Sequence, residues 1–265
     1  MKISELFSVK GKVAIVTGGS RGIGEMITAG FLANGAKVYI SARKELPLIQ
    51  KAQELSERYD GECIAIPCDL SSMEGIELFA QQIAEREDGI DFLINNAGAA
   101  WGETFEDFSE AGWDKVMDLN VKSIFFLTQK LKSLLTRNAS TEDPSRVINI
   151  GSIDGLNVPA FETYSYSTSK AAVHHLTRVL ATKLVKENIL VNAIAPGPYP
   201  SAMLGLAVNS DYSVIADANP RGRVGTPEDI AGLAIFLCSR AGAYTVGETI
   251  TSDGGLIKTA GHRLG

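Results

Sequence analysis

Short runs of β-branched and apolar residues alternate with longer amphipathic segments from residue 12 onward. The longer segments carry apolar residues at helical spacing, as Ile23, Ile27 and Phe31 do. Such alternation predicts βαβ crossovers around a parallel sheet with helices on both faces. The expected strands are residues 13–16, 37–41, 63–66, 92–95, 147–150, 190–194 and 248–251. The expected helices are residues 22–34, 47–59, 72–87, 113–136, 164–186 and a last one that begins near Thr226.

No linker, repeat or low-complexity segment interrupts this pattern, so residues 1–265 are expected to form a single domain. The stretch between Pro196 and Thr226 breaks the alternation and is rich in proline. A long irregular insertion late in such a domain is typical of a substrate lid, which we place around residues 197–225. A plain linker is the alternative.

The composition is that of an ordinary soluble protein, with 45% hydrophobic and 21% charged residues. A net charge of -6 without any Lys/Arg cluster argues against nucleic-acid binding. The apolar runs are too short to span a bilayer and the N-terminus lacks a signal-peptide core, so we expect a cytoplasmic protein with no membrane contact. Cys63, Cys68 and Cys238 form no metal-ligand pattern, so we expect free buried thiols and no metal.

A glycine-rich turn follows the first expected strand directly and reads TGGSRGIG over residues 17–24. Glycine allows a tight turn and lets the backbone approach a pyrophosphate, while the helix N-terminus supplies N–H groups and positive potential. The spacing GxxxGxG differs from the GxGxxG fingerprint, and such a turn could be an ordinary connection. Its place after the first strand favours phosphate binding.

The end of the second strand decides between two nucleotide cofactors. No acid stands between Lys37 and Lys44, where NAD-binding folds carry a carboxylate for the ribose 2′-hydroxyl. Arg21 and Arg43 could meet there, and guanidinium groups match a 2′-phosphate. They could instead be solvated surface arginines, but the missing acid favours NADP(H). Asp69 is placed to meet the adenine, and residues 95–98 to floor the nucleotide crevice.

Tyr166 and Lys170 lie four residues apart on an expected helix, fourteen residues after Ser152. This spacing places both side chains on one helix face. A nearby ammonium favours phenolate, so we expect Lys170 to lower the pKa of Tyr166 from its ordinary value near ~10. That makes the phenol a proton donor and acceptor usable near neutrality. With the glycine turn upstream, the pair predicts hydride chemistry on a carbonyl.

Five ordered motifs resemble those of the short-chain dehydrogenase/reductase family. They are TGxxxGxG at 17–24, NNAG at 95–98, Ser152, YxxxK at 166–170 and PG at 196–197, and the match covers essentially the whole chain. The resemblance implies a Rossmann-like, doubly wound parallel sheet of about seven strands in the order 3-2-1-4-5-6-7. Within the family, the chain looks most like the 3-oxoacyl (β-ketoacyl) reductase group of rhamnolipid pathways.

The resemblance also implies roles. Tyr166 would be the acid/base that protonates the carbonyl oxygen, Ser152 would hydrogen-bond that oxygen, and Lys170 would bind the nicotinamide ribose. Asn120 matches the asparagine that holds a relay water, and Ser201 stands where the family usually has threonine. The expected cofactor contacts are Gly18, Ser20, Arg21, Gly22, Ile23, Gly24, Arg43, Asp69, Leu70, Asn96, Ala97, Gly98, Tyr166, Lys170, Pro196, Gly197 and Ser201.

Trp101, Tyr199, Met203 and Leu204 would make the substrate rim apolar, although each could equally be lid packing. An apolar rim suits an acyl or aromatic ketone better than a sugar. The main prediction is therefore an NADPH-dependent carbonyl reductase that acts on a β-ketoacyl or β-keto ester substrate. A sugar or polyol dehydrogenase of the gluconate type is the alternative. A non-catalytic NADP-sensing module is disfavoured, because it would not need the intact catalytic residues.

Asp143 and Glu187 bear on the carrier of the substrate. In the fatty-acid-synthesis reductases that the chain resembles, basic residues at these two positions would flank the entrance for an acidic acyl-carrier protein. Acids at these positions disfavour docking of a carrier protein. A free, CoA-linked or esterified β-keto substrate is therefore kept as an alternative.

Two of the expected helices, 113–136 and 164–186, carry more apolar residues than one buried stripe needs. In the family such helices pack between subunits, so we expect a homodimer or homotetramer. The adjacent His174 and His175 are expected at the surface or at such an interface.

Overall fold

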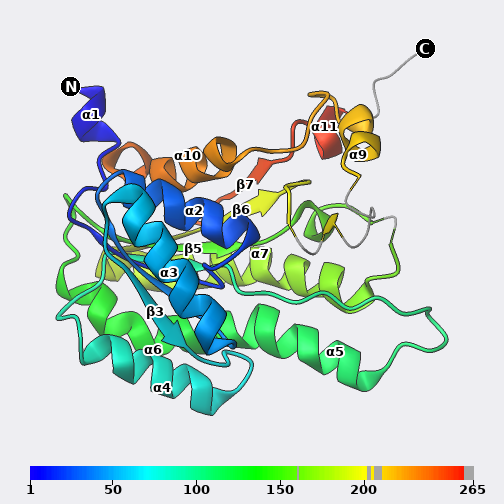
Figure 1. The fold of residues 1–265 in the computed structure, drawn as a ribbon, viewed down its shortest axis with the longest axis horizontal. Coiled ribbons are helices and arrows are strands. Elements are labelled where there is room, and N and C mark those ends of the chain that lie inside the picture. The colour runs from blue at the N-terminus through cyan, green and yellow to red at the C-terminus, as the bar shows by residue number, and fades with distance from the viewer. Residues whose placement is uncertain (160, 202–203, 206–210, 260–265) are drawn as a thin grey trace.

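A computed structural model describes residues 1–159, 161–201, 204–205 and 211–259. Its seven strands form one parallel sheet in the order β3-β2-β1-β4-β5-β6-β7, as predicted (Figure 1). The strands are β1 Val13–Thr17, β2 Lys37–Ala42, β3 Cys63–Pro67, β4 Phe92–Asn95, β5 Ser145–Ile150, β6 Ile189–Pro196 and β7 Thr249–Ser252.

Helices cover both faces of the sheet. One face carries α2 (Gly22–Ala33), α3 (Glu45–Tyr59) and α10 (Pro227–Cys238). The other carries α4 (Met73–Ala84), α6 (Ser123–Arg137) and α7 (Tyr164–Leu184). Shorter helices are α1 (Ile3–Leu6), α5 (Glu110–Met117), α9 (Ser213–Ala218) and α11 (Leu256–Thr259).

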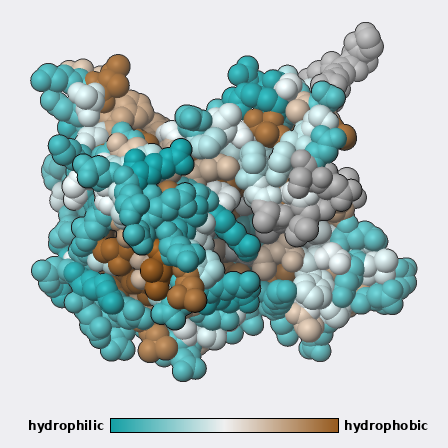
Figure 2. Space-filling view, in the orientation of Figure 1, coloured by the Kyte–Doolittle hydropathy of each residue, from teal (hydrophilic) through white to brown (hydrophobic). Residues whose placement is uncertain are grey.

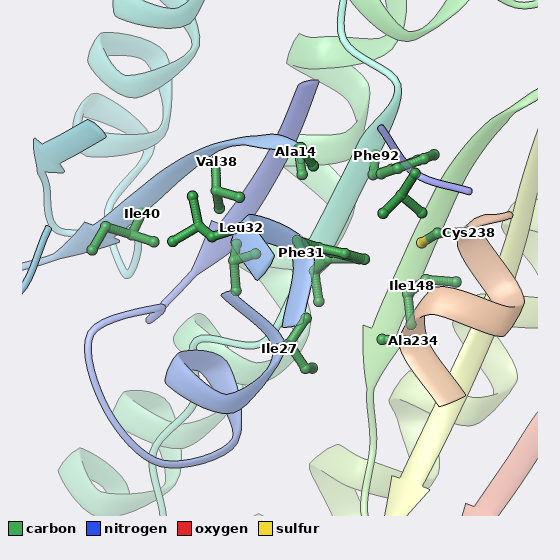
Figure 3. Close-up of a cluster of buried hydrophobic side chains, with 14 of the residues drawn as sticks. Ala14, Ile27, Phe31, Leu32, Val38, Ile40, Phe92, Ile148, Ala234 and Cys238 are labelled. Carbon is green, nitrogen blue, oxygen red and sulfur yellow. The ribbon is translucent and has the colours of Figure 1, made fainter. Parts of the chain in front are cut away.

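The hydrophobic core on the α2 face is formed by apolar side chains of α2 that pack against the strands. Ile27 and Phe31 lie one turn apart on α2 and point at the sheet, where Phe31 and Phe92 have ring centroids 5.8 Å apart (Figure 3). Burial of each such side chain contributes about 1.5–3 kcal/mol. Across the face seen in Figure 2, hydrophilic residues cover most of the surface.

The long helix expected over 113–136 is interrupted. Helix α5 begins earlier, at Glu110, because the Ser109 hydroxyl accepts the N–H of Gly112 at 3.2 Å. A π-helical segment, Asp118–Lys122, then separates α5 from α6. A π turn holds one extra residue and often marks a functional site. This one contains Asn120.

Two other local predictions are confirmed. Helix α10 has Thr226 as N-cap, proline at its first position and a capping box with Asp229, whose carboxylate accepts the Thr226 N–H at 2.8 Å. The three cysteines are free as expected, but only Cys63 and Cys238 are fully buried and Cys68 is half-buried; burial raises the pKa of each thiol to about 12. Among the described residues, no helix has the length and apolarity that crossing a membrane requires.

Candidate active site

The strand order reverses between β1 and β4, which are neighbours although two other strands separate them in sequence. The crossovers after β1 and after β4 therefore leave in opposite directions and open a crevice at the carboxyl ends of these strands. Gly18 follows β1, Asn96 follows β4 and Ser152 follows β5 by two residues. The expected site residues from these three turns consequently gather at one edge of the sheet.

The glycine turn fits a phosphate group. Gly18 and Gly22 have φ of 65° and 55°, which favours glycine. A Cβ at Gly24 would lie 2.4 Å from both the Gly18 carbonyl oxygen and Asn96 Nδ2. Helix α2 starts at Gly22, and its N-cap residue Arg21 makes no side-chain cap, so the first N–H groups of the helix stay available.

Thr17 was not among the expected site residues, yet it joins two of the turns. Its Oγ1 accepts the N–H groups of Asn96 and Ala97, both at 2.9 Å. Asn96 Nδ2 in turn donates to the Thr17 carbonyl at 2.8 Å. A hydroxyl residue at the last position of a strand that enters a glycine turn is the sequence signal that could have found it.

The expected adenosine contacts lie at the ends of β2 and β3. Arg21 and Arg43 are exposed, and Leu70 is buried. Partial burial tends to raise the pKa of Asp69, but hydrogen bonds from Ser71 and the nearby positive charge of Arg43 lower it overall. Arg43 and Asp69 are thus close enough to interact electrostatically at this end of the crevice.

The three expected catalytic side chains meet beside β5. Ser152 and Tyr166 lie close together, since the Ser152 hydroxyl partly offsets the burial that raises the pKa of Tyr166. Ser152 Oγ also accepts the N–H of Asp154 at 3.1 Å. Buried Lys170 donates from Nζ to the Ile150 carbonyl at 2.8 Å, and Nζ lies 5.5 Å from the centroid of the Tyr166 ring.

The expectation that Lys170 lowers the pKa of Tyr166 is wrong for this structure. Burial raises the pKa of Tyr166 to about 12, with a smaller lowering effect of the Ser152 hydrogen bond and a raising effect of Asp154. Burial also lowers the pKa of Lys170 to about 8. The ammonium bonds to the Ile150 carbonyl and not to the phenol. Tyr166 is therefore protonated at neutral pH, ready to act as an acid.

Asn120 is fully buried in the π-helical turn. Its Nδ2 donates to the Ala99 carbonyl and to Ser169 Oγ, both at 2.9 Å, and its Oδ1 accepts the Ala99 N–H at 2.8 Å. A Cβ at Gly98 would lie 3.3 Å from Asn120 Oδ1 and 3.7 Å from Lys170 Nζ, so Gly98 lies between the two side chains. The role of Asn120 in holding a relay water stays a prediction.

The segment after β6 returns to the glycine turn. Gly197, next to Pro196, donates its N–H to the Ser252 carbonyl at 3.0 Å. A Cβ at Gly22 would lie 3.3 Å from Ser201 Cβ, so Ser201 closes over the turn. Tyr199 is buried, with its hydroxyl 2.6 Å from Ser252 Oγ, and so belongs to packing and not to an exposed rim.

The other residues expected at the substrate rim are Trp101, Leu204 and Met203. Trp101 packs on α5, where a Cβ at Gly112 would lie 2.3 Å from the Trp101 ring. Lys115 Nζ lies 4.3 Å from the centroid of the same ring. Leu204 is half-buried, and Met203 falls outside the described residues.

Comparison with known proteins agrees with this geometry. A family model described as enoyl-(acyl carrier protein) reductase matches residues 18–257. The chain is 49% identical over 251 residues to the rhamnolipids biosynthesis 3-oxoacyl-(acyl-carrier-protein) reductase of Pseudomonas aeruginosa, covering 94% of this chain and 97% of that protein. The chain belongs to the short-chain dehydrogenase/reductase family. This confirms the predicted family and the prediction that the protein is an oxidoreductase.

Two further relatives of this family member bear on its function. The structure of the Pseudomonas aeruginosa RhlG/NADP active-site complex superposes with a TM-score of 0.91 at 48% identity, covering 95% of this chain and 98% of that one. The 2-dehydro-3-deoxy-D-gluconate 5-dehydrogenase of Dickeya dadantii is more distant, at 35% identity over 96% of this chain and 98% of that protein.

Asp143 and Glu187 are not placed at the entrance of this reductase domain. They precede the amino ends of β5 and β6, the edge of the sheet opposite Ser152. Each carboxylate is also paired, Asp143 with Lys12 at 2.6 Å and Glu187 with Lys132 at 2.7 Å. Their repulsion of an acidic carrier at the mouth of the site is therefore weaker than the sequence suggested.

His174 corrects another expectation. It is only 3% exposed, and its Nε2 accepts the N–H of Ser152 at 3.4 Å, so it lies behind Ser152 and not at the surface. His175 is exposed, with its Nδ1 3.1 Å from an Arg178 guanidinium nitrogen. Burial, and then the charge of Lys170, lower the pKa of His174 to about 4.

Because the imidazole of His174 is buried, we expect the free energy of unfolding to fall in mild acid. Unfolded, His174 binds a proton near pH 6.5, whereas in the folded chain it does so only near pH 4. The unfolded state therefore holds more protons between these values, and the free energy of unfolding should fall by about 3 kcal/mol as pH drops from 6.5 to 4. Urea unfolding of the wild-type chain and the His174→Gln variant across this range measures it. Parallel curves for the two proteins would contradict it.

Proposed function

We propose that this family member is an NADPH-dependent reductase of 3-oxoacyl substrates. The observation that carries the proposal is the gathering of Ser152, Tyr166 and buried Lys170, whose Nζ lies 5.5 Å from the Tyr166 ring centroid, at the edge of the sheet where the glycine turn opens. The 49% identity to a 3-oxoacyl-(acyl-carrier-protein) reductase supports the substrate class.

The surroundings of each proposed catalytic residue are consistent with one role in the reaction. The Ser152 hydroxyl, held by the Asp154 N–H, orients the substrate carbonyl oxygen and stabilises its developing negative charge. Protonated Tyr166 gives its proton to that oxygen. Lys170, charged near neutrality, offers N–H donors beside Tyr166 that suit ribose hydroxyls. NADPH supplies the hydride when bound.

The choice of NADP(H) rests on the arginines at the adenosine end. Arg43 is exposed just after β2, where no acid stands between Lys37 and Lys44 to repel a 2′-phosphate, and Arg21 is exposed in the glycine turn after β1. The related structure with a TM-score of 0.91 is described as an NADP complex, which supports the same choice. The proposed cofactor contacts are Gly18, Ser20, Arg21, Gly22, Ile23, Gly24, Arg43, Asp69, Leu70, Asn96, Ala97, Gly98, Tyr166, Lys170, Pro196, Gly197 and Ser201.

A pocket of about 410 Å³ lies next to the catalytic serine loop. Leu156, Val158 and Pro159 line it together with residues on the outer side of α7. Leu156 and Val158 are also exposed, which gives the neighbourhood of Ser152 an apolar character. Asp154, Asn157, Ser167 and Thr168 also line the pocket, so its lining is mixed, and only its apolar part suits an acyl chain.

An NADPH-oxidation screen tests the proposal. The panel contains β-keto thioesters on CoA and on acyl-carrier protein, β-keto esters, diketones, an enoyl thioester and keto-sugars such as a 2-dehydro-3-deoxygluconate. We expect the highest kcat/KM with a β-keto thioester or ester. Preference for a keto-sugar would instead support the gluconate-type alternative, which the Dickeya dadantii relative favours at 35% identity. Equal kcat/KM with NADH and NADPH would contradict the cofactor choice.

We also propose that residues 197–225 act as a lid on a single-domain protein. A backbone hydrogen bond of 2.9 Å from Gly225 N–H to the Pro198 carbonyl joins the two ends of this segment. Within it, residues 202–203 and 206–210 lie outside the described residues. Slower tryptic cleavage at Arg221 when NADPH and substrate are present would support closure. An unchanged rate would contradict it.

Assembly as a homodimer or homotetramer and a cytoplasmic location complete the proposal. Phe125 on α6 and Val179 on α7 are 38% and 52% exposed, which suits a subunit contact between these helices. The free thiols suit a reducing compartment. Light scattering after size-exclusion chromatography measures the assembly, and a monomer would contradict it. Cell fractionation measures the location.

A further inference from the structure

Helix α7 carries a third polar side chain on its catalytic face. Tyr166, Lys170 and His174 follow one another at intervals of four residues, so they form a single row along the helix. Tyr166 and Lys170 have roles in the proposed reaction, whereas His174 does not touch the space where a substrate would bind. It is nevertheless almost completely buried directly behind Ser152.

The serine loop is seated on this part of α7 through glycines. A Cβ at Gly151 would lie 2.0 Å from His174 Nε2. A Cβ at Gly155 would lie 2.5 Å from the backbone nitrogen of Ala171. Both ends of residues 151–155 therefore touch the helix, and between them the Ser152 N–H points at the imidazole, with a distance of 3.4 Å to Nε2.

A buried imidazole fills this space at a higher free energy than an apolar side chain would. His174 Nδ1 is buried and has no hydrogen-bond partner among the residues that the structure describes. A buried polar group without a partner costs free energy, which a leucine at this position would avoid. A leucine could make neither the contact to the Ser152 N–H nor the interaction with the Gly155 backbone that tends to raise the pKa of His174, and the first of these reaches Ser152 itself.

We propose that His174 is a positioning residue for Ser152. Its neutral ring carries the proton on Nδ1 and accepts the Ser152 N–H at Nε2. This contact holds the backbone of residue 152 so that the serine hydroxyl meets Tyr166. The proposal rests on the proposed function for its effect on rate, but the state of the ring can be measured in the free protein.

The rate test compares His174→Leu with His174→Gln, which keeps an acceptor near the position of Nε2, and with His175→Leu as the matched exposed neighbour. We expect His174→Leu to lower kcat about tenfold, because a small displacement of a catalytic group costs at least that much. The KM for NADPH should stay unchanged, His174→Gln should recover most of kcat, and His175→Leu should match the wild type. Unchanged kcat in His174→Leu would overturn the proposal.

A double-mutant cycle separates positioning from a general structural effect. If His174 acts through Ser152, Ser152→Ala should cost less in the His174→Leu background than in the wild type. Fully additive losses would overturn the proposal.

Nitrogen NMR of the free wild-type protein provides a readout that needs neither folding of a variant nor turnover. At pH 7 we expect His174 to be neutral with the proton on Nδ1. The opposite tautomer or an imidazolium would overturn the proposal. If none of the carbonyl compounds in the panel supported NADPH oxidation by the wild-type protein, the proposed function would be refuted. The NMR result would still decide the role of His174.

Discussion

Tyr166→Phe should reduce kcat by about 10²–10⁴-fold, the range expected when a general acid is removed. The structure gives the reason, because Tyr166 is protonated at neutral pH and lies beside Ser152, whereas phenylalanine leaves no proton to donate. The ring and its packing remain, so the Kd for NADPH, measured by fluorescence titration, should change by less than about twofold.

Tyr164→Phe is the matched control, because Tyr164 lies on the same helix with its hydroxyl bonded to Glu162 at 3.1 Å and not to Ser152. We expect that variant to keep wild-type kcat. Turnover retained in Tyr166→Phe, or lost equally in both variants, would show that Tyr166 is not the acid.

Gly24→Ala should weaken NADPH binding by about tenfold or more and also lower the melting temperature. The new Cβ would lie 2.4 Å from the Gly18 carbonyl oxygen and from Asn96 Nδ2, so the glycine turn and the turn after β4 must move apart. Overpacking of this kind costs about 1–3 kcal/mol. Titration with NADPH and thermal unfolding measure the two effects.

Gly232→Ala makes the same substitution in another helix, α10, and serves as the control. Apart from its chain neighbours and the nearby backbone of α10, nothing lies within 4 Å of the added Cβ there, so we expect a gain in stability of about 0.5–1 kcal/mol and unchanged NADPH binding. If Gly24→Ala behaved like Gly232→Ala, the close approach of the two turns would not matter for the cofactor.

Much of the fold could be predicted from local pattern. The register of apolar residues on α2 and the capping signals at Thr226 are properties of short segments, and the structure has both as expected. The interruption at Asp118–Lys122 could not be predicted in the same way. The apolar periodicity continues through it, and only the three hydrogen bonds of Asn120 to Ala99 and Ser169 show what the π turn holds in place.

The electrostatic predictions depended on surroundings that local spacing does not contain. Tyr166 and Lys170 are on one helix face as expected, but burial and the Ile150 carbonyl decide their pKa values, and the pKa of the tyrosine rises. Asp143 and Glu187 were placed at an entrance by counting along the chain. The parallel sheet puts them at its opposite edge, each beside a lysine.

The sequence by itself determined the parallel αβ sheet and the family, because periodicity and motif spacing are local properties of the chain. The strand order and the proposed catalytic residues followed from the resemblance to that family. Only the tertiary structure decided the protonation of Tyr166 and the place of His174 behind Ser152. Burial, hydrogen-bond partners and distances between separate elements arise when βαβ units pack together, and they control the free energy of each charged or polar group.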